Sequence, residues 1–249
     1  MQLSADAPTR WPQARVPPSP PHHRPVPPSA PRTADGGVPP HAIVLDALQP
    51  IGTPARVRRG RQIFAEGEPA AHWYWLASGA VQVCSFAEDG KRHVAELVLP
   101  GDLFGLEACA RRGATAEAAR DAVVVSYPRA RAEALVDADP RLARAFREVA
   151  CGRLHHAQAC LLRLGRTSAL ARVASFLLEM GERCRRAADG AVDVPVTRDD
   201  IADYLGLTSE TVSRALTELR RRGAIALPAR QSIHLADRAA IASAKDAGR

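Results

Sequence analysis

The segment from Thr197 to Gly223 constrains the fold of this chain most strongly. Its second half places Val212, Leu216 and Leu219 at spacings of four and three residues, which predicts a helix with one apolar stripe. A shorter helical pattern precedes it, and Gly206 stands between the two. We therefore expect two short helices around a tight turn, with a polar face on the second helix.

Residues at the ends of both helices agree with this geometry. Thr197 is followed three residues later by Asp200, a spacing that resembles a capping box at the start of the first helix. Thr208 or Ser209 is expected to cap the second helix, and Gly223 to end it. These local signals support a helix-turn-helix.

The polar face of the second helix carries side chains that can read base edges in DNA. Arginine matches the two acceptors of guanine, glutamate accepts from the cytosine amino group, and serine bonds to either kind of partner. A helix-turn-helix places such a face in the major groove. Base contacts are expected from four residues: Ser209, Glu210, Ser213 and Arg214. Contacts to the DNA backbone are expected from six more: Thr197, Thr208, Thr211, Thr217, Arg220 and Arg230.

Glu210 and Arg214 lie four residues apart, so we expect each to hold the other's side chain before DNA binds. The short runs Ile225–Leu227 and Ser232–Leu235 then predict a small β-hairpin, or wing. The net charge of +7 suits a polyanionic partner. Together these features favour a sequence-specific DNA-binding protein over a small helical subdomain with a solvated polar face.

Length and composition limit the other possibilities. A chain of 249 residues allows about two domains. Its five cysteines are scattered and odd in number, which favours a reduced, cytoplasmic setting over a disulfide framework. No apolar run approaches the roughly 20 residues that span a bilayer, and no phosphate loop, nucleophile motif or metal-ligand spacing is present. We therefore expect neither an enzyme nor membrane contact, and no cofactor or metal.

Composition also divides the chain. Residues 1–40 hold twelve of the twenty prolines and are expected to form a disordered tail, with a partner-binding segment as the alternative. Over residues 41–139, glycines punctuate short runs rich in β-forming residues, which predicts an antiparallel barrel or sandwich. A helix over residues 140–166 and a DNA-binding domain over residues 167–249 complete the expected organisation.

The helix over residues 140–166 carries a heptad seam. Its apolar residues recur at alternating spacings of four and three: Ala150, Leu154, Ala157, Leu161 and Leu164. This seam predicts a parallel helix pair in a homodimer, and the alternative is a face packed on its own β-domain. A two-fold dimer would place its recognition helices on successive major grooves, about 34 Å apart, and would require a palindromic site.

The order of β-domain, long helix, helix-turn-helix and wing resembles the Crp/Fnr family of bacterial transcription regulators over about residues 41–240. In the β-domain the resemblance rests on the motifs FAEGE, LASGAV and PGDLFG, which begin at Phe64, Leu76 and Pro100. In the DNA-binding domain it rests on Thr197–Thr208 and Glu210–Arg214, which look most like the FNR/FixK branch. The resemblance implies an α+β fold with a cyclic-nucleotide-binding-like antiparallel β-roll, a long dimerisation helix and a C-terminal winged helix-turn-helix.

The same resemblance implies a function. In the FNR/FixK branch a Glu-x-x-Ser-Arg pattern reads DNA, and here it falls on Glu210, Ser213 and Arg214. The implied target is a TTGAT-like inverted repeat, bound by a homodimer. RNA polymerase is the implied second partner, and the implied role is that of an activator in an oxygen- or redox-related circuit.

Departures from the family pattern bear on control. Gly105–Glu107 reads Gly-Leu-Glu where the cyclic-AMP-responsive branch has Gly-Glu-Leu, residues 114–117 contain no Arg-Ser pair, and Ala157-Gln158 replaces a Thr-Ser pair. Residues 1–83 contain no cysteine for the iron–sulfur cluster of FNR proper. Control by cyclic nucleotide or iron–sulfur cluster is therefore not expected. The alternative is a ligand-gated regulator that binds haem or a small molecule between the β-domain and the dimer helix.

Cys184 is a candidate for redox control. Arginines at positions 183, 185 and 186 flank it, and nearby cations lower a thiol's pKa and raise its reactivity. Oxidation would add negative charge near DNA phosphate, so we expect it to weaken DNA binding. The alternative is an inert linker thiol.

Overall fold

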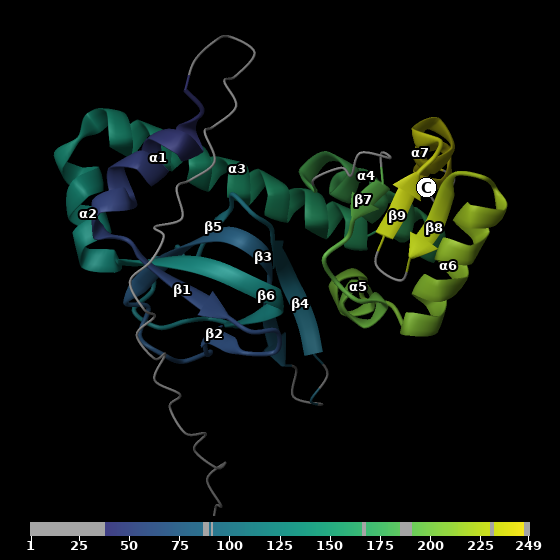
Figure 1. Ribbon diagram of the computed structural model, residues 1–249, viewed down its shortest axis with the longest axis horizontal. Coiled ribbons are helices and arrows are strands. Elements are labelled where there is room, and N and C mark those ends of the chain that lie inside the picture. Colours follow the sequence, from purple (N-terminus) through teal and green to yellow (C-terminus); the bar gives the residue numbers. More distant parts are fainter. Residues whose placement is uncertain are drawn as a thin grey trace, which may run out of the picture.

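The computed structural model describes residues 38–86, 90, 92–165, 168–184, 191–229 and 232–246. They form a β-roll and a smaller C-terminal domain, and the long helix α3 (Pro140–Leu164) runs from one to the other (Figure 1). Most of the Pro-rich segment over residues 1–40 lies outside the described residues. In the part that is described, no helix has the length and apolar character needed to cross a membrane.

The β-roll is an antiparallel sheet, as the glycine-punctuated runs predict. Strands β1, β6, β3 and β4 are neighbours in that order, while β2 pairs with β6 and β5 pairs with β3. The strands are β1 (Thr53–Val57), β2 (Gln62–Phe64), β3 (His72–Phe86), β4 (Arg92–Val98), β5 (Leu103–Phe104) and β6 (Thr115–Pro128). Strands β3 and β6 are the longest. At different points along its length, β3 pairs with β5 and with β4, and β6 pairs with β1 and with β2.

Gly79 allows the long strand β3 to bend where it crosses β6. The register between the two strands shifts around this residue, between Leu76 and Ser78, between Ser78 and Ala80, and between Ala80 and Val81. Its φ angle is +90°, a conformation that favours glycine, and an added Cβ would overlap the carbonyl oxygen of Asp121. Any side chain here would therefore strain β3 and push it away from β6.

Helices cover one side of the roll (Figure 1). They are α1 (Pro40–Leu48), the short 3-10 helix η1 (Gln49–Ile51), α2 (Arg129–Ala138) and the N-terminal half of α3. Trp73 of β3 packs into this layer, with its ring centroid 4.7 Å from that of Phe146 in α3. Leu48 of α1 and Leu142 of α3 are buried in the same cluster. This packing holds the first half of α3 on the roll.

The C-terminal domain is a winged helix-turn-helix. Its elements are α4 (Ala169–Arg183), β7 (Ala191–Asp193), α5 (Arg198–Leu205), α6 (Ser209–Arg221), β8 (Ile225–Ala229), β9 (Ser232–Leu235) and α7 (Arg238–Asp246). Strands β8 and β9 form the predicted hairpin. Strand β7 pairs with the other side of β9, so the wing has a third strand that the sequence did not predict.

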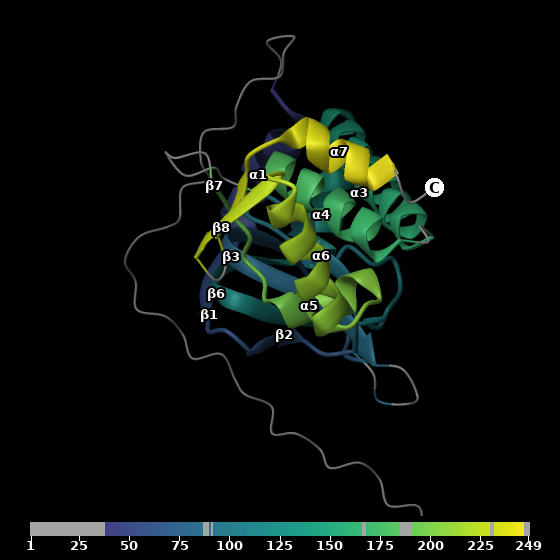
Figure 2. The ribbon, with the colours of Figure 1, turned by 90° about the vertical axis from the view of Figure 1, so that its right-hand side faces the viewer.

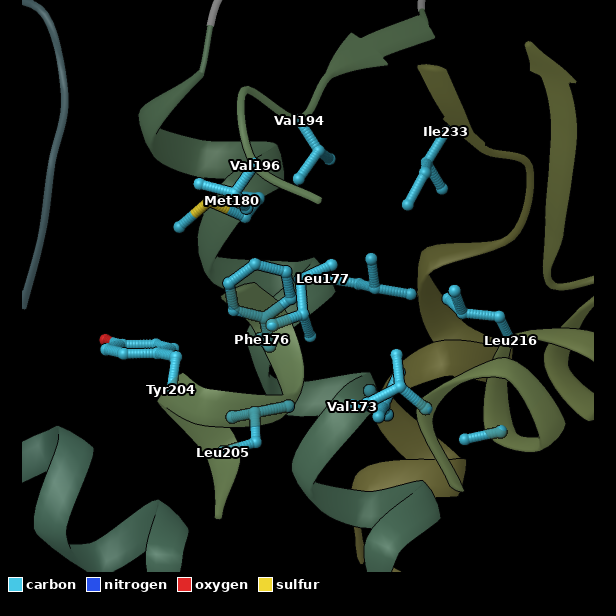
Figure 3. Close-up of a cluster of buried hydrophobic side chains, with 14 of the residues drawn as sticks. Val173, Phe176, Leu177, Met180, Val194, Val196, Tyr204, Leu205, Leu216 and Ile233 are labelled. Atoms are coloured by element: carbon cyan, nitrogen blue, oxygen red, sulfur yellow. The ribbon is translucent and has the colours of Figure 1, made fainter. Parts of the chain in front are cut away.

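Helix α4 forms the centre of this domain. Phe176, Leu177 and Met180 are buried on it, and Leu205 and Leu216 contribute to the same cluster from the helix-turn-helix (Figure 3). Burial of apolar area at about 25 cal/mol per Å² supplies most of the stability of such a core. The apolar faces of α5 and α6 are thus held against α4, which leaves their polar faces outside.

The roll also contacts the C-terminal domain directly. Strand β4 lies beside α5 (Figure 1), and Val94 and Leu97 belong to the buried cluster that contains Phe176. At the edge of this contact, the Arg92 guanidinium lies 3.3 Å from a carboxylate oxygen of Asp200. These contacts therefore fix the orientation of the helix-turn-helix relative to the roll.

The strain at Gly79 predicts a stability effect. Gly79→Ala is expected to lower the free energy of unfolding by about 2 kcal/mol or more, because alanine disfavours the positive φ and its Cβ meets the backbone of β6. Urea unfolding followed by tryptophan fluorescence measures this loss. Gly113→Ala is the matched control, because nothing lies within 4 Å of its added Cβ. Equal midpoints for the two variants would contradict the role given to Gly79.

Candidate nucleic-acid interface

Helix α5 begins with the predicted capping box. The Thr197 hydroxyl oxygen accepts from the Asp200 N–H at 3.2 Å, and an Asp200 carboxylate oxygen accepts from the Thr197 N–H at 2.9 Å. The helix ends at Gly206, whose φ of +63° is the left-handed conformation that the turn requires. The turn between α5 and α6 thus follows from local residue choices.

Helix α6 is capped by Thr208, the first of the two expected residues. Its hydroxyl oxygen accepts from the Thr211 N–H at 3.2 Å. The apolar stripe is confirmed, because Val212, Leu216 and Leu219 are all buried. Gly223 follows the last turn with a φ of +70°.

The expected base-reading residues lie together on the outer side of α6. Glu210 and Arg214 are exposed, and Ser209 and Ser213 are half-buried where α6 meets α5. Figure 2 shows α5 and α6 at the front of the molecule. The four side chains therefore form one accessible surface at the helix-turn-helix.

One expected contact within this surface is absent. Both residues are described, and no hydrogen bond or ion pair joins Glu210 to Arg214. An exposed pair of this kind contributes only a few tenths of a kcal/mol, which is too little to fix two long side chains. The two serines are held from α5 instead. Ser209 donates to the Asp199 carboxylate, and Arg198 donates to the Ser213 hydroxyl at 3.4 Å.

Of the three arginines at the C-terminal end of α6, two form ion pairs with residues that the structure describes and one, Arg220, does not. Arg221 and Arg222 both contact Glu218, at 2.9 Å and 2.7 Å. Hydrogen bonds from Arg221 and Arg222 lower the pKa of the Glu218 carboxyl to about 2. Within the part of the chain that is described, Arg220 makes no ion pair and is exposed. Arg220 is thus the arginine of this run best placed to meet a phosphate.

The other expected backbone contacts surround the same face. Thr208 and Thr211 lie at the N-terminus of α6, where their hydroxyl oxygens are 2.9 Å apart. Thr197 lies at the N-terminus of α5, and the exposed Thr217 donates to the carbonyl oxygen of Ser213 at 2.9 Å. Helix N-termini carry unpaired N–H groups that suit phosphate oxygens. Arg230 lies outside the described residues.

The expected dimer seam lies on the second half of α3 and is open. Leu154 is 60% exposed, Leu161 69% and Leu164 39%. Ala150 and Ala157 are exposed as well. The alternative, a face packed on its own β-domain, does not fit these values.

A buried cation stands where the resemblance would place the sugar and phosphate of a cyclic nucleotide. The Arg112 guanidinium lies 2.5 Å from the Glu107 carboxylate and donates to the carbonyl oxygen of Gly105 at 2.9 Å. It also lies 4.1 Å from the centroid of the Phe64 ring. Glu107 is therefore already engaged. The sequence did not single out Arg112, because its contacts with Phe64 and His72 come from distant strands and its contacts with Gly105 and Glu107 follow no regular spacing.

Two cavities adjoin this region. One of about 310 Å³ is lined by residues of the roll and by Ala150 and Arg153 of α3. The other, of about 510 Å³, lies between the loop at residues 100–103, α3 and Arg183. The Arg153–Glu96 ion pair, at 2.7 Å, borders both. Among the described residues, no group of three or more His, Cys, Asp or Glu side chains could hold a metal ion.

Cys184 follows the last residue of α4 and is half-buried. Its sulfur lies 3.8 Å from the sulfur of Met180. Of the three flanking arginines, only Arg183 is described, and its guanidinium is engaged by Asp102 at 2.6 Å and Glu179 at 3.0 Å. Redox control through Cys184 stays a prediction.

Comparison with known proteins identifies the same two domains. Residues 171–244 match the family model of the Crp-like helix-turn-helix domain, and residues 54–139 match that of the cyclic nucleotide-binding domain. The nitrogen fixation regulation protein FixK of Azorhizobium caulinodans is 40% identical over 194 residues, which are 77% of this chain and 78% of that protein. FixK of Bradyrhizobium diazoefficiens is 35% identical over 188 residues, 75% of this chain and 79% of that protein.

Solved structures give the same result. The structure of FixK2 from Bradyrhizobium japonicum superposes with a TM-score of 0.74 at 38% identity, covering 78% of this chain and 96% of that chain. A CRP-family transcriptional regulator from Thermus thermophilus has a TM-score of 0.62 at 32% identity, covering 77% and 96%. These relatives are regulators of transcription, a class of protein that is not enzymatic.

Proposed function

Because this chain belongs to the Crp/Fnr family of transcription regulators, we propose that it binds a TTGAT-like inverted repeat as a homodimer and activates transcription. The observation that carries the proposal is the polar face of α6, where Glu210 and Arg214 are exposed and Ser213 is half-buried, away from the buried apolar stripe. Glu210 and Arg214 are not paired with each other, so both are available to base edges.

The activating role rests on the relatives. Two regulators that are 32% and 34% identical over about two thirds of this chain carry the names of transcriptional activators, and they come from Rhizobium leguminosarum and Rhodopseudomonas palustris. By analogy, this chain recruits RNA polymerase to the promoters it binds, in an oxygen- or redox-related circuit.

The homodimer is supported by the open seam of α3. An isolated chain would leave Leu154, Leu161 and Leu164 in water, although each could bury apolar area worth about 1.5–3 kcal/mol. Pairing with the same face of a second copy removes that exposure. The two-fold axis would then place two copies of α6 on an inverted repeat.

Control without cyclic nucleotide is supported by Arg112. Its guanidinium engages Glu107 and the backbone of Gly105, two positions that a nucleotide would need. The alternative, gating by haem or a small molecule, would use the 510 Å³ cavity beside α3. The walls of that cavity carry Glu96, Asp102 and Arg183 beside apolar residues such as Leu103 and Val149, so a ligand there would need polar groups as well as an apolar surface.

The proposal predicts a DNA sequence and two distinguishable mutational effects. Selection of bound duplexes from random DNA is expected to recover TTGAT-N4-ATCAA. Arg214→Ala should cost about 1–3 kcal/mol at one base pair of each half-site and relax selection there. Arg220→Ala should weaken binding to every duplex and reduce the salt dependence of the affinity by about one ion.

Fluorescence anisotropy with the selected duplex and a scrambled one, at several salt concentrations, separates these effects. Arg220 is the matched control for Arg214, since both are exposed arginines of α6. If Arg214→Ala weakened both duplexes equally, the base-reading role of α6 would be wrong.

If the seam of α3 is the dimer interface, a charged substitution in it should change the oligomeric state. Leu161→Glu should convert the dimer to a monomer at micromolar concentration, because two carboxylates would meet at the two-fold axis. Leu162→Glu is the control, because Leu162 is 78% exposed and lies outside the seam. Sedimentation velocity measures both variants. A dimer that survives Leu161→Glu would rule out this seam as the interface.

The candidate role of Cys184 predicts that oxidation changes the affinity for DNA. Peroxide treatment should lower the affinity of the wild-type protein for the selected duplex, because an oxidised sulfur carries added negative charge. Cys184→Ser should abolish that sensitivity and leave the untreated affinity unchanged, as measured by anisotropy. Cys109→Ser provides the control, since Cys109 is an exposed thiol of the roll. Equal peroxide sensitivity of the wild type and Cys184→Ser would identify Cys184 as inert.

A further inference from the structure

The first two residues of α5 contact the two serines on the DNA-facing side of α6. Ser209 donates its hydroxyl proton to a carboxylate oxygen of Asp199. Ser213, one turn further along α6, accepts at its hydroxyl oxygen from the Arg198 guanidinium at 3.4 Å. Asp199 and Arg198 are both exposed, so neither contact belongs to the packing of the domain.

The two contacts have opposite chemical consequences. A serine hydroxyl has one proton to donate and two lone pairs that accept. Since an ionised carboxylate only accepts, Ser209 spends its single proton on Asp199 and keeps lone pairs alone. Since a guanidinium only donates, Ser213 keeps its proton and can donate it elsewhere.

This difference matters because a serine hydroxyl does not otherwise discriminate between bases. Free to rotate, it can donate to a base acceptor or accept from a base amino group. With its role fixed, it can satisfy only one kind of base edge. In the major groove the amino groups belong to adenine and cytosine, whereas guanine and thymine present only acceptors, and adenine presents an acceptor at N7 as well.

We propose that Asp199 and Arg198 are positioning residues for DNA specificity, which fix Ser209 as a hydrogen-bond acceptor and Ser213 as a donor. Ser209 then selects adenine or cytosine at the base it faces, and Ser213 selects a base acceptor. The inference rests on the proposed reading of DNA by α6. It adds two residues outside α6 that set what the helix reads.

Asp199 also carries a negative charge close to where the phosphates would lie. That charge opposes binding to every duplex, whatever its sequence. Replacement of Asp199 therefore changes two properties, general affinity and selectivity at one base pair. Two replacements separate them, because asparagine keeps a carbonyl oxygen that accepts from Ser209 and alanine does not.

The test uses the full-length protein and duplexes with the inverted repeat recovered by selection, changed symmetrically at one half-site position at a time. Asp199→Ala and Asp199→Asn should both raise the affinity for a scrambled duplex several-fold, through loss of the charge. Asp199→Ala alone should lower the discrimination at one base pair about fivefold, the size of one hydrogen bond. Asp199→Asn should retain that discrimination.

A double variant locates the effect at Ser209. In the Ser209→Ala background, Asp199→Ala should leave the discrimination at that base pair unchanged, because the hydroxyl it acts through is gone. Arg198→Ala should relax a different base pair, the one that Ser213 faces. Thermal unfolding by circular dichroism checks that each variant is folded, as expected for exposed positions.

The outcomes distinguish this inference from the proposed function. If Arg214→Ala relaxes its base pair while Asp199→Ala changes only general affinity, α6 reads DNA and the positioning role is wrong. Equal loss of discrimination in Asp199→Asn and Asp199→Ala would also overturn it, since charge would then be the cause. If no variant alters selectivity at any position, the reading of DNA by α6 fails, and this inference fails with it.

Discussion

The carboxylate of Asp200 joins the two halves of this molecule. One of its oxygens accepts from the N–H and the hydroxyl of Thr197, and so caps α5. The other lies 3.3 Å from the Arg92 guanidinium of the roll. A helix cap contributes about 1 kcal/mol to the free energy of unfolding, and the partly buried ion pair with Arg92 adds to it. The start of the helix-turn-helix and its docking on the roll therefore depend on the same side chain.

Apolar packing supplies the rest of that docking. Val94 and Leu97 of β4 belong to one buried cluster with Phe176 of α4 and Tyr204 of α5. Helix α3 extends past this contact, anchored on the roll by Leu142 and with its seam exposed along its second half. The fold thus holds two surfaces at defined places, the side of α6 proposed to face DNA and the seam of α3. The proposed function requires both.

Much of this organisation could be predicted from the sequence, because it depends on spacing within short segments. The capping box at Thr197 and Asp200, the turn at Gly206 and the stripe through Val212 each follow from residues within one or two helical turns. The β-roll and the wing were predictable as classes of structure, since alternating runs and glycines mark strands and turns. The family resemblance supplied their order along the chain.

Contacts between distant segments could not be predicted in the same way. Arg92 and Asp200 are 108 residues apart, and Arg112 reaches the backbone of His72 across 40 residues. Strand β7 is three residues long, too short for a periodic pattern. The expected pair of Glu210 and Arg214 failed for the opposite reason, since a favourable spacing on an exposed helix does not outweigh the entropy of two long side chains.

The contact between β4 and α5 has a consequence for the geometry of a promoter. In the proposed dimer, each helix-turn-helix is held by its own roll through Arg92 and the cluster around Phe176. The two helix-turn-helix domains therefore keep a fixed separation along the DNA and a fixed angle to each other around its axis. One extra base pair between half-sites turns the second by about 35°, because B-DNA makes a turn in roughly 10–10.5 base pairs. A DNA-binding domain docked on its roll does not rotate to follow the second half-site. The length of the spacer is therefore part of what the dimer recognises, although no side chain contacts the spacer.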